Sequence, residues 1–221
     1  MTDILYLWPA GTRFGGRVPK EKLYQNGAAN SAEREKFVSD VQRIIWSHKL
    51  AEDTINLPST PAVPEIEVFQ IDCKHDDVAD AVLKVIDKAV PNPIIFEITR
   101  ESRGRNEIRM VAAHKTLGTS SPKVQSYYST QWMPADAERV ALPTAISFPA
   151  LYAAVLAPLT PIDTRPGEDM SKVGARLDAV RRLQREITGL ERKIRSEPQL
   201  NRKIDLRRSL KAKQAELEEQ K

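Results

Sequence analysis

The chain has 221 residues, of which 41% are hydrophobic and 29% are charged, so it suits one domain with an appendage or two small domains. No apolar run approaches the roughly 18 residues that a membrane helix needs, and the N-terminal segment lacks the basic and apolar regions of a secretory signal. The single cysteine, Cys73, excludes an internal disulfide and a cysteine-rich zinc site. We therefore expect a soluble, cytoplasmic protein with no membrane partner.

Positive charge is concentrated toward the C-terminus. Residues 171–221 hold 15 Lys/Arg and 8 Asp/Glu, a net charge of +7, whereas the rest of the chain has a net charge of −3. A basic tail on a slightly acidic body is typical of a tail that meets a polyanion or an acidic partner surface. A solvated helical face that is rich in arginine is an equally good interpretation.

The N-terminal part predicts a short strand that leads into a glycine-containing loop. Residues 30–50 then predict one amphipathic helix, because apolar residues recur at helical spacing from Phe37 to Leu50. Asn30 or Ser31 can cap the N-terminus of this helix.

A proline-rich connector, residues 57–65, follows as an extended loop. Beyond it, the alternating and helical patterns predict strands over residues 65–74, 93–100, 107–115 and 125–131, and helices over residues 76–90 and 147–159. In the first of these strands, Glu65 and Glu67 fall on the register opposite to the apolar residues. The polar turn at 101–106 predicts a β-hairpin with a loop of several residues. This order favours an α+β fold, a mixed β-sheet with helices packed on one face, over residues 1–160.

A proline-rich linker, residues 161–170, separates this body from a basic helical arm, residues 171–221. Apolar residues of the arm follow the spacing of a coiled-coil seam, with Lys213 at one seam position: Leu183, Ile187, Leu190, Ile194, Leu206, Leu210 and Leu217. Pro198 favours two helices over one straight helix. An antiparallel hairpin would bury both seams against each other, whereas an extended arm would need a partner, and the seam is too short to decide between them.

Five segments resemble a bacterial family, domain-of-unknown-function family 4391: FGGRVPKEKLY, IIWSHKLAEDTINLP, VPEIEVFQI, PIIFEI and LERKIRSEPQLNRKIDL. They span nearly the whole chain. Such a family brings no assigned catalytic residues. The resemblance implies a DNA-processing context, beside helicases and DNA methyltransferases in restriction-type defence loci. Pro198 departs from the more helix-friendly tail expected of the family.

The predicted hairpin also resembles part of a restriction-endonuclease-type site, with Glu97 on one strand and Lys115 at the end of the next. In such a site two carboxylates hold a divalent metal ion and the lysine stabilises developing charge. The residue two before Lys115 is Ala113, so Asp72 would have to supply the second carboxylate. Solvent-facing strand residues are the simpler interpretation.

Other catalytic chemistry has little support. His48, His75 and His114 show no metal-ligand spacing. No nucleophile elbow accompanies the serines, and Cys73 carries no sign of activation. We expect no metal, no cofactor and no catalytic residue.

Two groups of cations are candidates for binding a phosphate backbone or an acidic partner. Near the N-terminus, Arg13, Arg17 and Lys20 surround glycines that let backbone amides approach a phosphate, although the P-loop pattern is absent and a plain flexible loop is the better interpretation. The second group lies in the arm: Arg181, Arg182, Arg185, Arg192, Lys193, Arg195, Arg202, Lys203, Arg207 and Arg208. No base-reading motif accompanies them, so binding would be independent of sequence.

These patterns lead to one main hypothesis and two alternatives. The main hypothesis is a non-catalytic accessory subunit whose body docks on a larger DNA-processing enzyme, a helicase or a methyltransferase, and whose arm holds a partner helix or the DNA backbone. The first alternative is a metal-dependent nuclease that uses Glu97 and Lys115, with or without Asp72. The second is a structural protein that self-associates through the arm.

Overall fold

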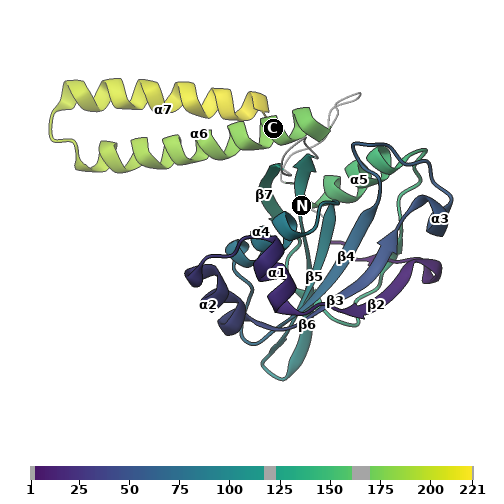
Figure 1. Ribbon diagram of the computed structural model, residues 1–221. Coiled ribbons are helices and arrows are strands. Elements are labelled where there is room, and N and C mark those ends of the chain that lie inside the picture. The colour runs from purple at the N-terminus through teal and green to yellow at the C-terminus, as the bar shows by residue number, and fades with distance from the viewer. Residues whose placement is uncertain (1–2, 117–122, 161–169, 221) are drawn as a thin grey trace. The chain divides into compact units, whose positions relative to one another are not determined.

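The structure is a computed structural model that describes residues 3–116, 123–160 and 170–220 (Figure 1). It divides into two compact units, Met1–Thr160 and Pro161–Lys221. The predicted α+β fold with a mixed sheet and a C-terminal helical hairpin is confirmed. Of the predicted linker, only its last residue is described, as the start of a helix. Within these ranges, no helix combines the length and apolarity that crossing a bilayer requires.

The strands of the first unit are β1 (Tyr6–Leu7), β2 (Arg13–Arg17), β3 (Val41–Leu50), β4 (Ile66–Cys73), β5 (Ile94–Ser102), β6 (Arg105–Thr116), β7 (Lys123–Ser129), β8 (Met133–Pro134) and β9 (Val140–Ala141). Its helices are η1 (Ala10–Thr12), α1 (Lys20–Asn26), α2 (Ser31–Asp40), α3 (Glu52–Ile55), α4 (Asp80–Ala89), α5 (Phe148–Leu156) and η2 (Ala157–Leu159). The strands and helices predicted between residues 65 and 159 all appear among them.

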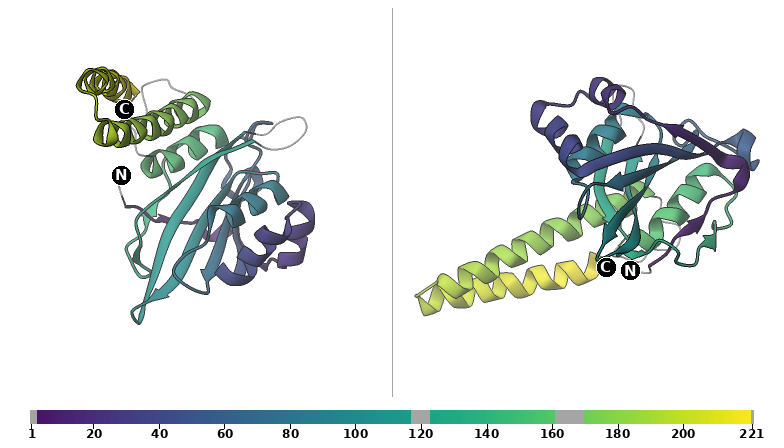
Figure 2. Two further views of the ribbon diagram at one scale, coloured as in Figure 1. Left: turned by 90° about the vertical axis from the view of Figure 1, so that its left-hand side faces the viewer. Right: turned by 90° about the horizontal axis from the view of Figure 1, so that it is seen from below.

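Seven strands form the main sheet in the order β2-β3-β4-β5-β6-β7, with β8 beside β6. Within the main sheet as described, β4 and β5 form the one parallel pair, and α4 makes the crossover that a parallel pair requires. A separate two-stranded sheet pairs β1 with β9. Helices α1, α2 and α4 cover one face of the main sheet, and α5 covers the other (Figures 1 and 2). The prediction of helices on one face only was therefore wrong.

The predicted single helix over residues 30–50 is also wrong, because the chain changes from helix to strand at Val41. The N-terminus of α2 is as expected: the Asn30 side chain accepts from the amide of Glu33, whose carboxylate accepts from the Asn30 amide. At the other end of α2, two lysines from outside the helix bind its last carbonyl groups. Lys20 donates to the carbonyl oxygens of Phe37 and Val41, and Lys74 donates to that of Val38.

The β5–β6 hairpin has a two-residue turn instead of the expected longer loop. Ser102 pairs with Arg105, and the two residues between them, Arg103 and Gly104, both have positive φ angles, 51° and 74°. Such a turn matches the right-handed twist of the two long strands.

A buried lysine connects the main sheet to α4. The Nζ atom of Lys115, on β6, donates to the carbonyl oxygen of Asp87 in the last turn of α4 (2.6 Å) and to those of Val90 (2.5 Å) and Asn92 (2.9 Å) just after the helix. It also lies 3.2 Å from the Asp87 carboxylate, which accepts a second hydrogen bond from Tyr127. The Lys115 side chain is completely buried. It therefore supplies a donor to the buried carbonyl group of Asp87 and to the half-buried carbonyl groups that follow the helix.

The second unit is an antiparallel hairpin of α6 (Met170–Ser196) and α7 (Leu200–Gln220), as one of the two open alternatives predicted. Pro198 lies in the short connection between the helices. Lys213, at its seam position, lies 3.2 Å from Glu186 of α6 and 2.8 Å from Glu216 of α7, and these carboxylates raise its pKa. Arg176 of α6 donates to the carbonyl oxygen of Gln220 near the end of α7.

We predict that Lys115→Met destabilises the first unit by about 3 kcal/mol, because it leaves carbonyl groups and the Asp87 carboxyl buried without their donor. The free energy of unfolding in urea measures this. Lys88→Met is the matched control, since Lys88 is an exposed lysine in the last turn of α4. Equal stabilities of the two variants would contradict the role of Lys115.

Candidate functional site

The structure places Glu97 and Lys115 on opposite faces of the sheet. Phe96 and Val111 are register partners in the core under α4, and Lys115 points to that same side, toward Asp87. Glu97 follows Phe96 on β5 and therefore points to the other face. The pair that the nuclease alternative requires is not brought together.

Both acids of that alternative are occupied by other side chains. Glu97 is 6% exposed and accepts hydrogen bonds from the indole of Trp8 (2.8 Å) and from Arg139 (2.6 Å). This carboxylate anchors two segments, before and after the main sheet, to the face that α5 also covers. The signal for these contacts is absent from the sequence, because Trp8 and Arg139 are far from Glu97 along the chain.

Asp72 is engaged in a second network. One of its carboxylate oxygens binds Arg43 at 2.5 Å, and the other accepts from Gln70 and Thr99 at 2.9 and 2.8 Å. Nowhere in the described ranges do three or more His, Cys, Asp or Glu side chains gather in a way that suits a metal ion.

Glu67 is a buried acid: it lies on the register opposite to Ile66 and Val68, as the alternation predicts, and both registers of this strand are buried. It lies on β4 at 1% exposure, and one of its carboxylate oxygens has no hydrogen-bond partner in the described structure. Burial raises the pKa of Glu67 to about 8, and a hydrogen bond from Asn92 offsets only part of this shift. Glu67 therefore binds a proton in the folded protein at pH values at which it is ionised in the unfolded chain.

This proton makes stability depend on pH. Between about pH 4.5, the ordinary value, and about pH 8, the folded state holds one more proton than the unfolded state, so stability falls as the pH rises. We predict that wild type loses at least about 1 kcal/mol more than Glu67→Gln between pH 5 and pH 8, measured by urea unfolding. Glu101→Gln, at an exposed position of β5, should behave as wild type. If the free energies of unfolding of wild type and Glu67→Gln change equally with pH, Glu67 does not bind this additional proton.

The glycine-containing segment is a strand rather than the expected flexible loop. Gly15 has a φ of +72° at a register irregularity between β2 and β3, which is the conformation that a β-bulge needs. A side chain at Gly16 would collide with the Phe14 ring, which lies 4.1 Å from the ring of Trp46. These glycines therefore shape the edge strand.

The N-terminal candidate cations have different roles. Arg13 and Arg17 are exposed at this edge and make no ion pair within the described residues. Lys20 is bound to the end of α2, so it serves the fold rather than a ligand.

The arm cations divide between two helices. Those on α6 are Arg181, Arg182, Arg185, Arg192, Lys193 and Arg195, and those on α7 are Arg202, Lys203, Arg207 and Arg208. Two of them, Arg182 and Arg208, lie 3.8–3.9 Å from acids on their own helix. Arg185 and Arg192 have no such partner among the described residues.

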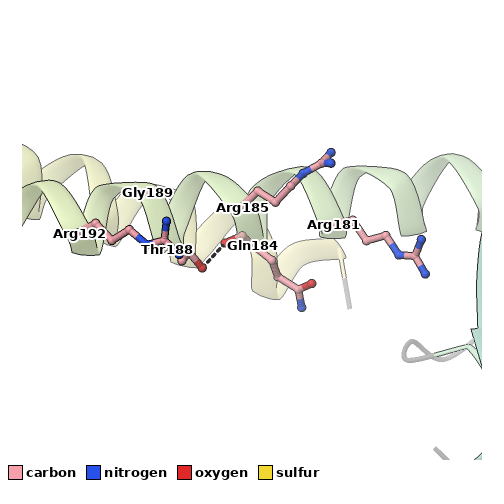
Figure 3. Close-up of a pocket in the computed structure, with 6 residues that line it drawn as sticks. All are labelled: Arg181, Gln184, Arg185, Thr188, Gly189 and Arg192. Atoms are coloured by element: carbon pink, nitrogen blue, oxygen red, sulfur yellow. Dashed lines mark hydrogen bonds between the residues drawn. The ribbon is translucent and has the colours of Figure 1, made fainter. Parts of the chain in front are cut away.

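An open groove of about 550 Å³ lies on α6, and Figure 3 shows the side chains that line it. It is lined by Arg181, Gln184, Arg185, Thr188, Gly189 and Arg192. These residues recur at helical spacing on the side of α6 opposite to the seam residues Leu183, Ile187, Leu190 and Ile194. The groove therefore has three arginines and no acid.

Gly189 also lines this groove, although no sequence pattern pointed to it. A β-carbon at Gly189 would meet nothing within 4 Å. Thr188 beside it turns its hydroxyl to the carbonyl oxygen of Gln184 at 2.9 Å (Figure 3). The hairpin's own packing thus gives no steric reason for a glycine, which is an unfavourable residue inside a helix.

Together, the fold and this groove define an α+β protein that carries a basic helical hairpin. The chain belongs to the family described as Domain of unknown function (DUF4391), whose model matches residues 7–217. The family resemblance seen in the sequence is thereby confirmed. No curated protein and no solved structure matches the chain.

Proposed function

We propose that this protein is a non-catalytic accessory subunit of a bacterial DNA-processing assembly, built around a helicase or a methyltransferase, and that α6 holds the DNA backbone. The observation that carries the proposal is the groove of Arg181, Arg185 and Arg192 around Gly189. The internal engagement of Glu97 and Asp72 supports a role other than catalysis.

The spacing of the arginines suits a phosphate backbone. Arg181 and Arg192 are separated by eleven residues of helix, which corresponds to about 16 Å, or roughly five base pairs along a duplex. Guanidinium groups bind phosphate oxygens with two parallel hydrogen bonds. Contacts of this kind fix position without reading sequence, and they weaken as salt rises.

The glycine in the groove also supports DNA binding, because it leaves space on the surface of α6. Gly189 costs about 1 kcal/mol relative to alanine in a helix interior. Because no described neighbour occupies the space above it, an approaching backbone can use that space.

We predict that Arg185→Glu/Arg192→Glu weakens binding to a short DNA duplex at least about tenfold at low salt and lowers the slope of log K against log salt by about two. Fluorescence anisotropy across a salt series measures both quantities. Lys84→Glu/Lys88→Glu is the matched control, with the same charge change on exposed lysines of α4. Equal weakening by both double variants would mean that only net charge matters and would contradict a site on α6.

We further predict that Gly189→Ala stabilises the hairpin by about 1 kcal/mol and yet weakens DNA binding about threefold or more. Thermal unfolding followed by circular dichroism and duplex anisotropy measure the two effects. Ser209→Ala, at an exposed position of α7, raises helix propensity as well and should leave affinity unchanged. Unchanged affinity of Gly189→Ala would remove Gly189 from the interface.

A further inference from the structure

Two large apolar side chains are exposed at the start of α7. Leu200 is 69% exposed and Ile204 is 40% exposed. They are four residues apart, so they are neighbours on one face of the helix. The seam residues of α7, Leu206, Leu210 and Leu217, are more buried and lie on another side of the helix. The apolar pair is therefore not used by the hairpin itself.

The same face continues into a basic stretch. Arg207, Arg208 and Lys211 follow Leu200 and Ile204 at helical spacing, and all three are exposed. The face thus changes within three turns from apolar to cationic. A ligand that covers it needs apolar groups beside carboxylates or phosphates.

This combination separates the α7 face from the α6 groove. The groove holds arginines without an apolar neighbour, which suits a phosphate backbone. A phosphate backbone offers nothing to cover Leu200 and Ile204, whereas an amphipathic helix lays an apolar stripe on such a face.

Charge argues against a second copy of this chain as the occupant. Residues 192–208, around the tip of the hairpin, hold seven Lys/Arg and two Asp/Glu, a net charge of +5. Two such tips repel each other, whereas an acidic surface is attracted to one of them.

We propose that the α7 face formed by Leu200, Ile204, Arg207, Arg208 and Lys211 docks an acidic amphipathic helix of a partner protein. Apolar side chains of that helix cover Leu200 and Ile204, and its carboxylates bind the three cations. The inference rests on the proposed function in that it assigns the partner site of an accessory subunit. It places partner and DNA on different helices of the hairpin.

The test uses the full chain and a synthetic, fluorescein-labelled, helix-forming peptide with leucines along one face and glutamates beside them. We expect saturable binding by anisotropy, weakened at least about tenfold by Leu200→Ser/Ile204→Ser. A peptide with lysines in place of the glutamates should not bind. Val38→Ser/Ile146→Ser is the matched control, because these residues are 59% and 87% exposed in the other unit.

Absence of binding, or equal binding by Leu200→Ser/Ile204→Ser, overturns the proposal. So does a dimer in sedimentation that this variant abolishes, since a second copy would then occupy the face. The DNA assay on the same variants separates the two proposals. Leu200→Ser/Ile204→Ser should retain DNA affinity, and Arg185→Glu/Arg192→Glu should retain more than about a third of the peptide affinity.

Discussion

An α-helix ends with four carbonyl groups that have no donor in the helix, and lysine or arginine side chains supply donors at three such ends in the described part of this chain. Lys20 and Lys74 do so for α2, Lys115 for α4 and Arg176 for α7. Lys115 has the most demanding position, since burial lowers its pKa and the nearby Asp87 carboxylate opposes that shift. It joins β6 to α4, and the β4–α4–β5 crossover depends on where that helix ends.

These structural cations narrow the search for function. The sequence made Lys20 a candidate for binding phosphate and Lys115 a candidate for a nuclease site. In the structure both lysines donate to backbone carbonyl groups of the first unit. Glu97 is likewise held by Trp8 and Arg139. The cations still available to a ligand include Arg185 and Arg192, which are exposed and line a groove whose lining residues include no acid. The best candidate for a binding site is therefore on the helical hairpin and not on the sheet.

Sequence patterns predicted the elements with a clean period, such as β4, α4 and the β5–β6 hairpin, and failed where the strand is irregular. β3 has register shifts near Val41 and Trp46, so its buried residues, Val41, Ile44 and Leu50, do not alternate and resemble a helical spacing. The seam of α6 could be predicted from the spacing of its apolar residues, but the groove could not, because cations occupy many positions of the helix outside the seam. The structure shows that Arg181, Arg185 and Arg192 line one groove with Gly189, and that no described neighbour fills the space above this glycine.

The central claim is that DNA lies on α6 and not on the other basic surfaces. Modification of arginines with phenylglyoxal, read by mass spectrometry with and without a short duplex, tests it most directly. The account predicts that DNA protects Arg185 and Arg192, whereas Arg207 and Arg208 stay reactive. Protection of Arg13 and Arg17, or of Arg207 and Arg208, with Arg185 and Arg192 still reactive, would contradict it.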